Sequence, residues 1–292
     1  MRAIKFKFAK QFIFSILSCL LFWTCGLEQP LPENPYDPLN LNYSAPRTQI
    51  ISSPSGTVTE KSVTFAWQQK DPFYNSDSLD SETYGKIWYR YRLNADLWSM
   101  WSMNTSVAFD FLDDQDYLFE VMSKYPTNIM EDVPYPKKSF TMDAYRSSLV
   151  FSPRMTILRS DLGENTFAVS VRAEDVSDIM GVHIIVDYDP DFLKLNAISL
   201  FINESDFLLR NGGDIIQFLD HDSLSGELAA DLVMVMGSGG GVDGSGDLME
   251  LQFEQIAESD TMYISFGAES SIRNSMNEEI LEDRGNGVVY VW

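Results

Sequence analysis

Apolar and polar residues alternate with a period of two along most of the chain after residue 48. Every second side chain from Val63 to Trp67 is apolar, and the segments Ile87–Leu93 and Tyr117–Val121 repeat the pattern. No segment carries a sustained 3.6-residue apolar period with helix caps. Because successive side chains of a strand point to opposite faces, the pattern predicts half-buried strands and an all-β protein.

The expected strands fall into two groups, and 292 residues are enough for two domains that each bury a core. Residues 48–144 contain roughly seven strands, which is typical of an immunoglobulin-like sandwich. Residues 149–292 contain about nine or ten strands, for which a two-sheet jelly roll is the economical arrangement. A short joint at residues 145–148 separates the two modules.

The first residues predict export. Met1–Gln11 is basic, and Phe12–Thr24 is apolar but too short for a stop-transfer helix, so residues 1–25 are expected to be a signal peptide. Its end resembles a lipoprotein signal, which implies a lipidated cysteine: Cys25 is favoured, because Cys19 would leave an apolar segment on the mature end. The Pro-rich residues 26–47 are expected to form a tether. The protein is therefore expected to be lipid-anchored to the bacterial envelope, on the outer membrane.

The charge narrows the range of partners. The chain has 43 acidic and 21 basic residues and a formal net charge of −22. An acidic surface repels phosphate backbones and anionic headgroups, so nucleic acid is excluded and membrane contact is expected through the lipid anchor alone. Both cysteines precede the modules, which leaves the modules no thiol for a disulfide or for nucleophilic catalysis.

The first module carries a family resemblance. The passages SVTFAW, YRYRLNADLWSMWS and DYLFEV resemble bacterial fibronectin type III-like modules, including the triple-tyrosine type. WSMWS also matches the WSxWS box of cytokine-receptor fibronectin domains, but it precedes the strand Val107–Phe111 and we treat the match as coincidental. Trp67 is in phase with a core strand, and Trp98 and Trp101 are expected to pack on arginine stems. The alternative is an exposed aromatic row that stacks on sugar rings.

Three segments of the second module resemble the cohesin domain, the receptor module of cellulosome scaffolds. They are FAVSVRAEDVSDIMGVHIIVDYDPDFLKL, with an acidic turn and a YDP corner, then SDFLLRNGG, then GGVDGSGDLMELQFE. The ending NGVVYVW resembles the final strand of the family. The segments follow in the family's order and cover nearly the whole module. The resemblance implies a flattened jelly roll whose sheet face docks a calcium-loaded dockerin, with the calcium held by the partner.

The resemblance places the partner-binding face on the outward residues of Val182–Asp187 and Ala229–Val235. Gly181 and His183 stand where family members often supply an Asn and an Asp, so the dockerin type is left open. An apolar stripe on this face suggests a cover, which is either a partner or a loop or module of the chain itself. The expected face residues are His183, Ile185, Asp187, Asp231, Val233 and Val235, with Ala229 between them.

Other functions are weighed against docking. The module could bind polysaccharide directly, with Phe192, Phe201 and Phe218 as the few aromatic candidates, or be a structural envelope component without a ligand. Asp243 and Asp247 favour a solvated turn over a calcium site, since their spacing matches no EF-hand loop. Sequence neighbours of His221 cannot face it productively along a strand. We therefore expect a binding protein, not an enzyme, without a cofactor or resident metal.

Overall fold

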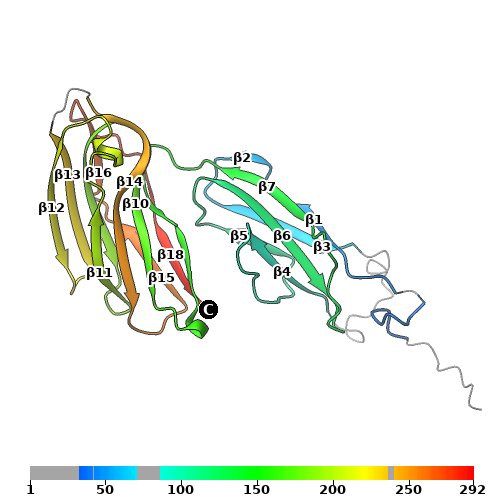
Figure 1. Ribbon diagram of the computed structural model, residues 1–292. Helices are drawn as coiled ribbons and strands as arrows, with labels where there is room; N and C mark the ends of the chain where they lie inside the picture. Colours follow the sequence, from blue (N-terminus) through cyan, green and yellow to red (C-terminus); the bar gives the residue numbers. More distant parts are fainter. Residues whose placement is uncertain (1–32, 42, 71–85, 236–239) are drawn as a thin grey trace, which may run out of the picture.

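The computed structural model describes residues 33–41, 43–70, 86–235 and 240–292. It confirms the predicted all-β class: two β-sandwiches follow each other along the chain (Figure 1). In the first sandwich the sheets have the strand orders β1-β3-β5 and β2-β7-β6-β4. The strands of this module are β1 (Thr48–Ser52), β2 (Gly56–Val58), β3 (Val63–Gln69), β4 (Trp88–Leu93), β5 (Ser106–Phe109), β6 (Asp116–Lys124) and β7 (Lys137–Met142).

Aromatic side chains form the core of the first module. Phe65 on β3 stacks on Phe119 on β6, with ring centroids 3.9 Å apart, and both are fully buried. Trp67 is 1% exposed and packs against Tyr91. These residues occupy alternate positions of their strands, so the period of two predicted from the sequence is the period of burial. The expected core role of Trp67 is confirmed.

The second module contains eleven strands among the described residues and two short 3-10 helices, Ser160–Leu162 and Phe207–Leu209. The sequence predicted nine or ten strands. The number is higher because residues 148–158 and residues 283–291, at the two ends of the module, are each divided into two strands. The strands are β8 (Ser148–Ser152), β9 (Met155–Leu158), β10 (Thr166–Tyr188), β11 (Leu193–Leu200), β12 (Asp214–Asp222), β13 (Glu227–Val235), β14 (Val242–Gln255), β15 (Thr261–Phe266), β16 (Ser271–Asn274), β17 (Asp283–Gly285) and β18 (Gly287–Val291).

Strand β10 belongs to both sheets of this module. Its first part pairs with β14 and β8, and its second part pairs with β13, β16 and β15. The sequence predicted an acidic turn between these parts. The structure instead has a continuous 23-residue strand with bulges, where Asp175 and Asp178 adopt positive φ angles of 52° and 57°. A bulge bends a strand without ending it, so the two sheets share this strand.

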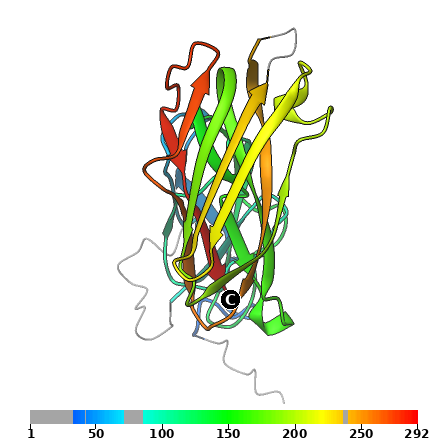
Figure 2. The ribbon, with the colours of Figure 1, turned by 90° about the vertical axis from the view of Figure 1, so that its left-hand side faces the viewer.

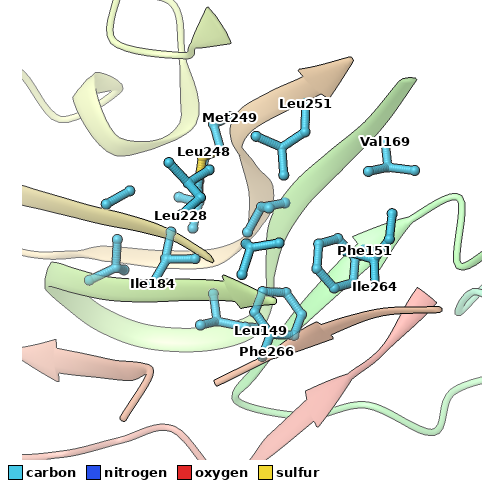
Figure 3. Close-up of a cluster of buried hydrophobic side chains, with 14 of the residues drawn as sticks. Leu149, Phe151, Val169, Ile184, Leu228, Leu248, Met249, Leu251, Ile264 and Phe266 are labelled. Carbon is cyan, nitrogen blue, oxygen red and sulfur yellow. The ribbon is translucent and has the colours of Figure 1, made fainter. Parts of the chain in front are cut away.

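Inward side chains of both sheets fill the core of the second module (Figure 3). Phe151 on β8 stacks on Phe266 on β15, with centroids 4.2 Å apart. Ile184 and Leu228 are fully buried on the neighbouring strands β10 and β13. Stacked aromatic pairs add about 0.5–1.5 kcal/mol to the contribution of the area they bury. The core thus fixes which side of β10 and β13 remains outward.

The glycine-rich segment enters a strand earlier than expected. The sequence predicted that residues 237–246 form a long connection, but β14 begins at Val242. A Cβ atom on Gly246 would lie 2.2 Å from the ring of Phe207, so glycine is required there by the close approach of the 3-10 helix. Residues 236–239 lie outside the described residues.

Part of the predicted tether packs on the first module. Tyr36 is 3% exposed and its ring lies 4.4 Å from that of Tyr125. The Tyr125 hydroxyl donates a hydrogen bond to the Ser44 carbonyl at 2.8 Å. The predicted signal peptide, with Cys19 and Cys25, lies outside the described residues. Among the residues that are described, no helix has the length and apolar character needed to cross a bilayer.

The two modules meet at a buried arginine. Arg154, 4% exposed, follows β8 and reaches into the first module, where its Nη1 donates to the Leu112 carbonyl at 3.2 Å. Its backbone N–H donates to the Asp113 carboxylate at 2.9 Å, and its guanidinium lies 4.3 Å from the Tyr145 ring centroid. Burial raises the pKa of Asp113, while Arg154 opposes that shift. Buried charged groups need such partners, so the two modules make a specific contact at this junction.

Candidate functional site

The structure brings the six predicted face residues together on the outer side of one sheet. In the pairing of β10 with β13, His183 lies opposite Asp231 and Gly181 lies opposite Val233. Directly opposite residues of antiparallel strands point to the same side. The face residues alternate with the buried residues Val182, Ile184, Val186, Leu232 and Met234.

The apolar part of this face is exposed. Val233 and Val235 are 48% and 44% exposed. Figure 2 shows β12 and β13 in front, on the side that faces away from the first module. The sequence left open whether a loop or the first module covers these residues, and in the described parts of the chain neither of them covers the β13 valines.

Ile185 and Asp187 are less accessible than the valines. The Gly267 N–H donates to the Ile185 carbonyl at 2.9 Å, and the Ile185 N–H donates to the Ser270 hydroxyl at 3.0 Å. A Cβ atom on Gly267 would lie 2.6 Å from the Ile185 side chain, so the β15–β16 loop lies directly against it. Both face residues are half-buried. The exposed apolar area of the face therefore lies mainly on β13 and on the strand that pairs with the other edge of β13.

That strand is β12, which sequence reasoning left out of the face. Ile216 lies opposite Val233 and Phe218 lies opposite Asp231, and the two side chains are 64% and 59% exposed. The hairpin could have been found from the sequence, because an Asp-x-x-x-Gly turn at Asp222–Gly226 separates the two strands. What hid it is the composition of β12, where apolar residues occupy both sides of the strand and the period of two is weak.

The predicted His183 makes an internal contact. Its Nδ1 lies 2.7 Å from an Asp231 carboxylate oxygen, and both side chains are partly exposed. Beside this pair lies a shallow hollow over Gly181, which lacks a side chain, and Arg273 contributes to its wall. The Arg273 guanidinium is held by the Asn277 carbonyl at 2.9 Å. The centre of the face thus combines one histidine–carboxylate pair, one arginine and an apolar rim.

The groups considered for catalysis or metal binding have contacts within the fold. The Nε2 atom of His221 lies 2.7 Å from the Tyr188 hydroxyl, while the adjacent Asp220 and Asp222 alternate to the other side of β12. Asp243 accepts a hydrogen bond from the Asp178 N–H, and Asp247 pairs with Arg172. In the described parts of the chain no group of three or more His, Cys, Asp or Glu side chains is arranged to hold a metal ion.

The aromatic candidates for sugar stacking do not form a row. Phe192 packs against the core, Phe201 follows β11 in one sheet, and Phe218 lies on β12 in the other. In the first module Trp98 lies between the guanidinium groups of Arg92 and Arg90, 4.5 and 5.0 Å from its ring centroid. Trp101 likewise lies between Arg90 and Lys124. The expectation that both tryptophans pack on arginine stems is confirmed, and WSMWS forms one half of a cation–π ladder.

Comparisons with known proteins were made for the whole chain. No family model matches it, and no curated protein matches it. Similar solved structures include a non-cellulosomal cohesin from Archaeoglobus fulgidus, with 11% identity, TM-score 0.38, and coverage of 51% of this chain and 92% of that chain. The sixth cohesin of scaffoldin B from Acetivibrio cellulolyticus, in complex with a dockerin, gives 15% identity, TM-score 0.38, and coverage of 51% and 100%.

A third similar structure is the Coh-OlpA–Doc918 complex of Clostridium thermocellum, with 14% identity, TM-score 0.40, and coverage of 51% of this chain and 100% of that chain. It is described as a type I cohesin–dockerin complex. All three are cohesin modules, and each matches about half of this chain.

Proposed function

We propose that this protein is an envelope-anchored docking protein whose second module binds a partner protein on the outer face of β10, β13 and β12. The observation that carries the proposal is the exposed apolar stripe formed by Ile216, Phe218, Val233 and Val235 on neighbouring strands. Such contiguous apolar surface is unusual on a soluble module unless another molecule covers it. The stripe lies on the face that the cohesin-like sequence segments predicted.

The finer proposal is that the partner is a dockerin-bearing protein, such as a polysaccharide-degrading enzyme or an envelope component. It is supported by the order of the cohesin-like segments along the second module. The calcium would belong to the partner. The first module would hold the docking face away from the membrane, and Cys25 would carry the lipid anchor.

Capture of the native partner tests the proposal. The immobilised full chain is incubated with secreted and envelope proteins from the source cells, and captured proteins are identified by mass spectrometry. Val233→Glu and His183→Glu should each weaken capture of the same protein at least tenfold, which corresponds to about 1.4 kcal/mol. The control is Leu162→Glu, because Leu162 is 68% exposed and lies on a 3-10 helix outside the face.

Two outcomes separate the coarse proposal from the fine one. If both face variants capture as much protein as the wild type, docking on this face is refuted. If capture depends on the face but survives a calcium chelator, a docking function stands and the dockerin is excluded as the partner.

A further inference from the structure

A cleft lies between the two modules, on strands other than those of the proposed docking face. It has a volume of about 270 Å³, and both modules contribute to its walls. The first module lines it with β4, with β5 and with the segments that follow them, and the second module lines it with β9 and β18. Ligand sites often form at such junctions between domains, and a volume just below the usual range of about 300–1,000 Å³ suits a small molecule.

The second module turns one side of β9 and β18 toward the cleft. Val289 belongs to the core of this module and Val291 packs against that core, so the alternating residues Tyr290 and Trp292 point outward. Ile157 lies opposite Tyr290 in the parallel pair of β9 with β18, which places it on the same side. Trp292 is 44% exposed. This wall therefore presents two aromatic rings beside an aliphatic side chain.

The first module is open toward the cleft between β4 and β5, each of which is the last strand of its sheet. Tyr91 on β4 and Phe109 on β5 meet edge to face, with ring centroids 5.8 Å apart. Both rings are half-buried, because they pack against the core of the first module. Burial raises the pKa of Tyr91, and Tyr290 of the second module raises it further. The aromatic walls of the two modules thus lie close to each other.

The charged groups of the cleft leave an excess of negative charge. Its charged lining residues are Arg92, Asp96 and Asp110. Arg92 is neutralised by Glu120 on the neighbouring strand, with its Nη2 atom 2.6 Å from a carboxylate oxygen. Asp96 and Asp110 are exposed at the rim, and neither forms an ion pair with another described residue. The cleft thus combines aromatic rings with two uncompensated carboxylates.

The same junction already holds one cation against aromatic rings. The guanidinium group of Arg154 lies 4.3 Å from the Tyr145 ring centroid and 5.6 Å from that of Phe111. Phe111 also lines the cleft. An aromatic residue of the cleft wall therefore contacts a cation within the protein itself.

This combination of groups selects a ligand by charge as well as by shape. The faces of tyrosine and tryptophan rings attract cations, and the attraction grows when water is excluded. The rim carboxylates and the net charge of −22 attract a cation and repel an anion. A bare metal ion would leave the apolar lining uncovered, whereas an organic cation with an apolar body also removes apolar surface from water.

We propose that the cleft between the modules binds a small organic cation, in which an amine or quaternary ammonium group is attached to an aromatic or aliphatic body. The cationic group lies near the rings of Tyr290 and Trp292 and the rim carboxylates, and the apolar body lies against Ile157. This site shares no residue with the proposed docking face, so it does not depend on the proposed function.

The test compares probes of nearly equal size and different charge, namely benzylamine, benzyl alcohol and benzoate. Each is titrated into the isotopically labelled full chain, and the indole N–H signals are followed by NMR, with the Trp292 signal assigned from Trp292→Phe. Benzylamine should shift the Trp292 signal saturably, with a Kd below about 5 mM. It should bind about tenfold more tightly than benzyl alcohol, and benzoate should not bind.

Removal of the rim charges shows whether the carboxylates contribute. Asp96→Asn combined with Asp110→Asn should weaken the binding of benzylamine about three- to tenfold and leave that of benzyl alcohol unchanged, because only the charged probe loses an attraction. The matched control is Glu60→Gln combined with Glu204→Gln, which removes the same charge at exposed positions outside the cleft. The control should bind both probes as the wild type does.

Several results would overturn the proposal. Equal affinity for benzylamine and benzyl alcohol, or tighter binding of methyl glucoside than of benzylamine, would show that the cleft does not select a cation. An equal loss of benzylamine binding in the control double variant would show that the acidic surface as a whole collects cations. A Trp292 signal that benzylamine leaves unshifted would show that the cleft does not admit the probe, which contradicts the proposal as well.

Discussion

One side of a single sheet in the second module is covered at one end and bare at the other. The register of the strand pairs β13–β10, β10–β15 and β15–β18 shows that Val233 on β13 and Val288 on β18 point to the same outer side. Val288 is 1% exposed, although it does not belong to the core of its own module, whereas Val233 is 48% exposed. The Val288 N–H donates to the carbonyl of Arg154, the residue at the module junction, so this valine lies next to the junction, whereas Val233 has no such neighbour among the described residues.

The covered end shows what a complete interface looks like in this protein. Phe111 from the first module lies 6.3 Å from the Tyr263 ring, and the Arg154 guanidinium lies 5.6 Å from the ring of the same Phe111. Lys61 pairs with Asp283 across the junction. Apolar contact and paired charge thus occur together. The bare end carries the apolar stripe of Ile216, Phe218, Val233 and Val235, but it lacks an opposing surface among the described residues.

The largest expected effect is a difference in stability between the same substitution at the two ends. Val288→Asp should reduce the free energy of unfolding by about 3–4 kcal/mol, because it buries an unpaired charge in the junction. Val233→Asp makes the same chemical change on the bare end and should alter stability by about 0.5 kcal/mol at most. Thermal and urea unfolding of both variants measure the difference. Similar losses would show that the two ends are equally covered.

The second effect concerns the buried arginine. Arg154→Met should cost about 2–3 kcal/mol, because the carbonyls of Leu112 and Asn286 lose their donor inside the junction. Small-angle X-ray scattering should also show a broader range of distances between the modules. Arg146→Met is the control, since the Arg146 side chain is 65% exposed. An unchanged scattering curve for Arg154→Met would show that the modules do not depend on this residue for their arrangement.

The buried and outward sides of the strands could be predicted from the sequence, but the module junction could not. The alternation of Val182, Ile184 and Val186 gave the buried side of β10, and with it the outward side that carries His183. The junction could not be predicted, because Arg154 is an isolated charge whose burial depends on contacts with residues more than 40 positions earlier. The acidic turn at Asp175–Asp178 was misread since a bulged strand and a turn use the same residue types.

Only part of the candidate site could be predicted from the sequence, because burial on one side of a strand is the signal on which the prediction depends. Val233 and Val235 were found from alternation, but Ile216 and Phe218 were not included, because nearly every residue of β12 is exposed on both sides. A period-two pattern arises when one side of a strand is buried and the other is exposed. An edge strand that extends beyond the core is exposed on both sides, so the pattern is weak there. Register against β13, a tertiary property, was needed to place them.

A third, smaller effect tests whether the covering module is stable in its own right. Trp101 lies 4.6 Å from the Arg90 guanidinium and 4.7 Å from the Lys124 ammonium. Trp101→Ala should cost about 1–2 kcal/mol, because two cation–π contacts are lost. Met100→Ala, at an 81% exposed neighbour, should have almost no effect. The scattering curve should stay that of the wild type; a change in it would place the ladder within the junction after all.

The smallest effect is a pH dependence of stability that comes from Asp113 at the covered end. Burial raises the pKa of Asp113 above its ordinary value of 3.8, so ionisation costs more in the folded state than in the unfolded one. The contribution of protonated Asp113 is therefore fully present below pH 3.8 and is lost as the pH rises through the folded-state pKa. An asparagine side chain at this position does not titrate. In unfolding experiments, Asp113→Asn should thus gain stability relative to the wild type between about pH 4 and pH 7, by about 1 kcal/mol or less.

The matched control for this pH dependence lies on the bare end. Asp220→Asn replaces an exposed carboxylate there, so its stability relative to the wild type should show no such trend with pH. A difference between Asp113→Asn and the wild type that stays constant over the same range, or falls, would show that Asp113 is not desolvated. The covered end would then lack the environment that distinguishes it from the bare one at this position.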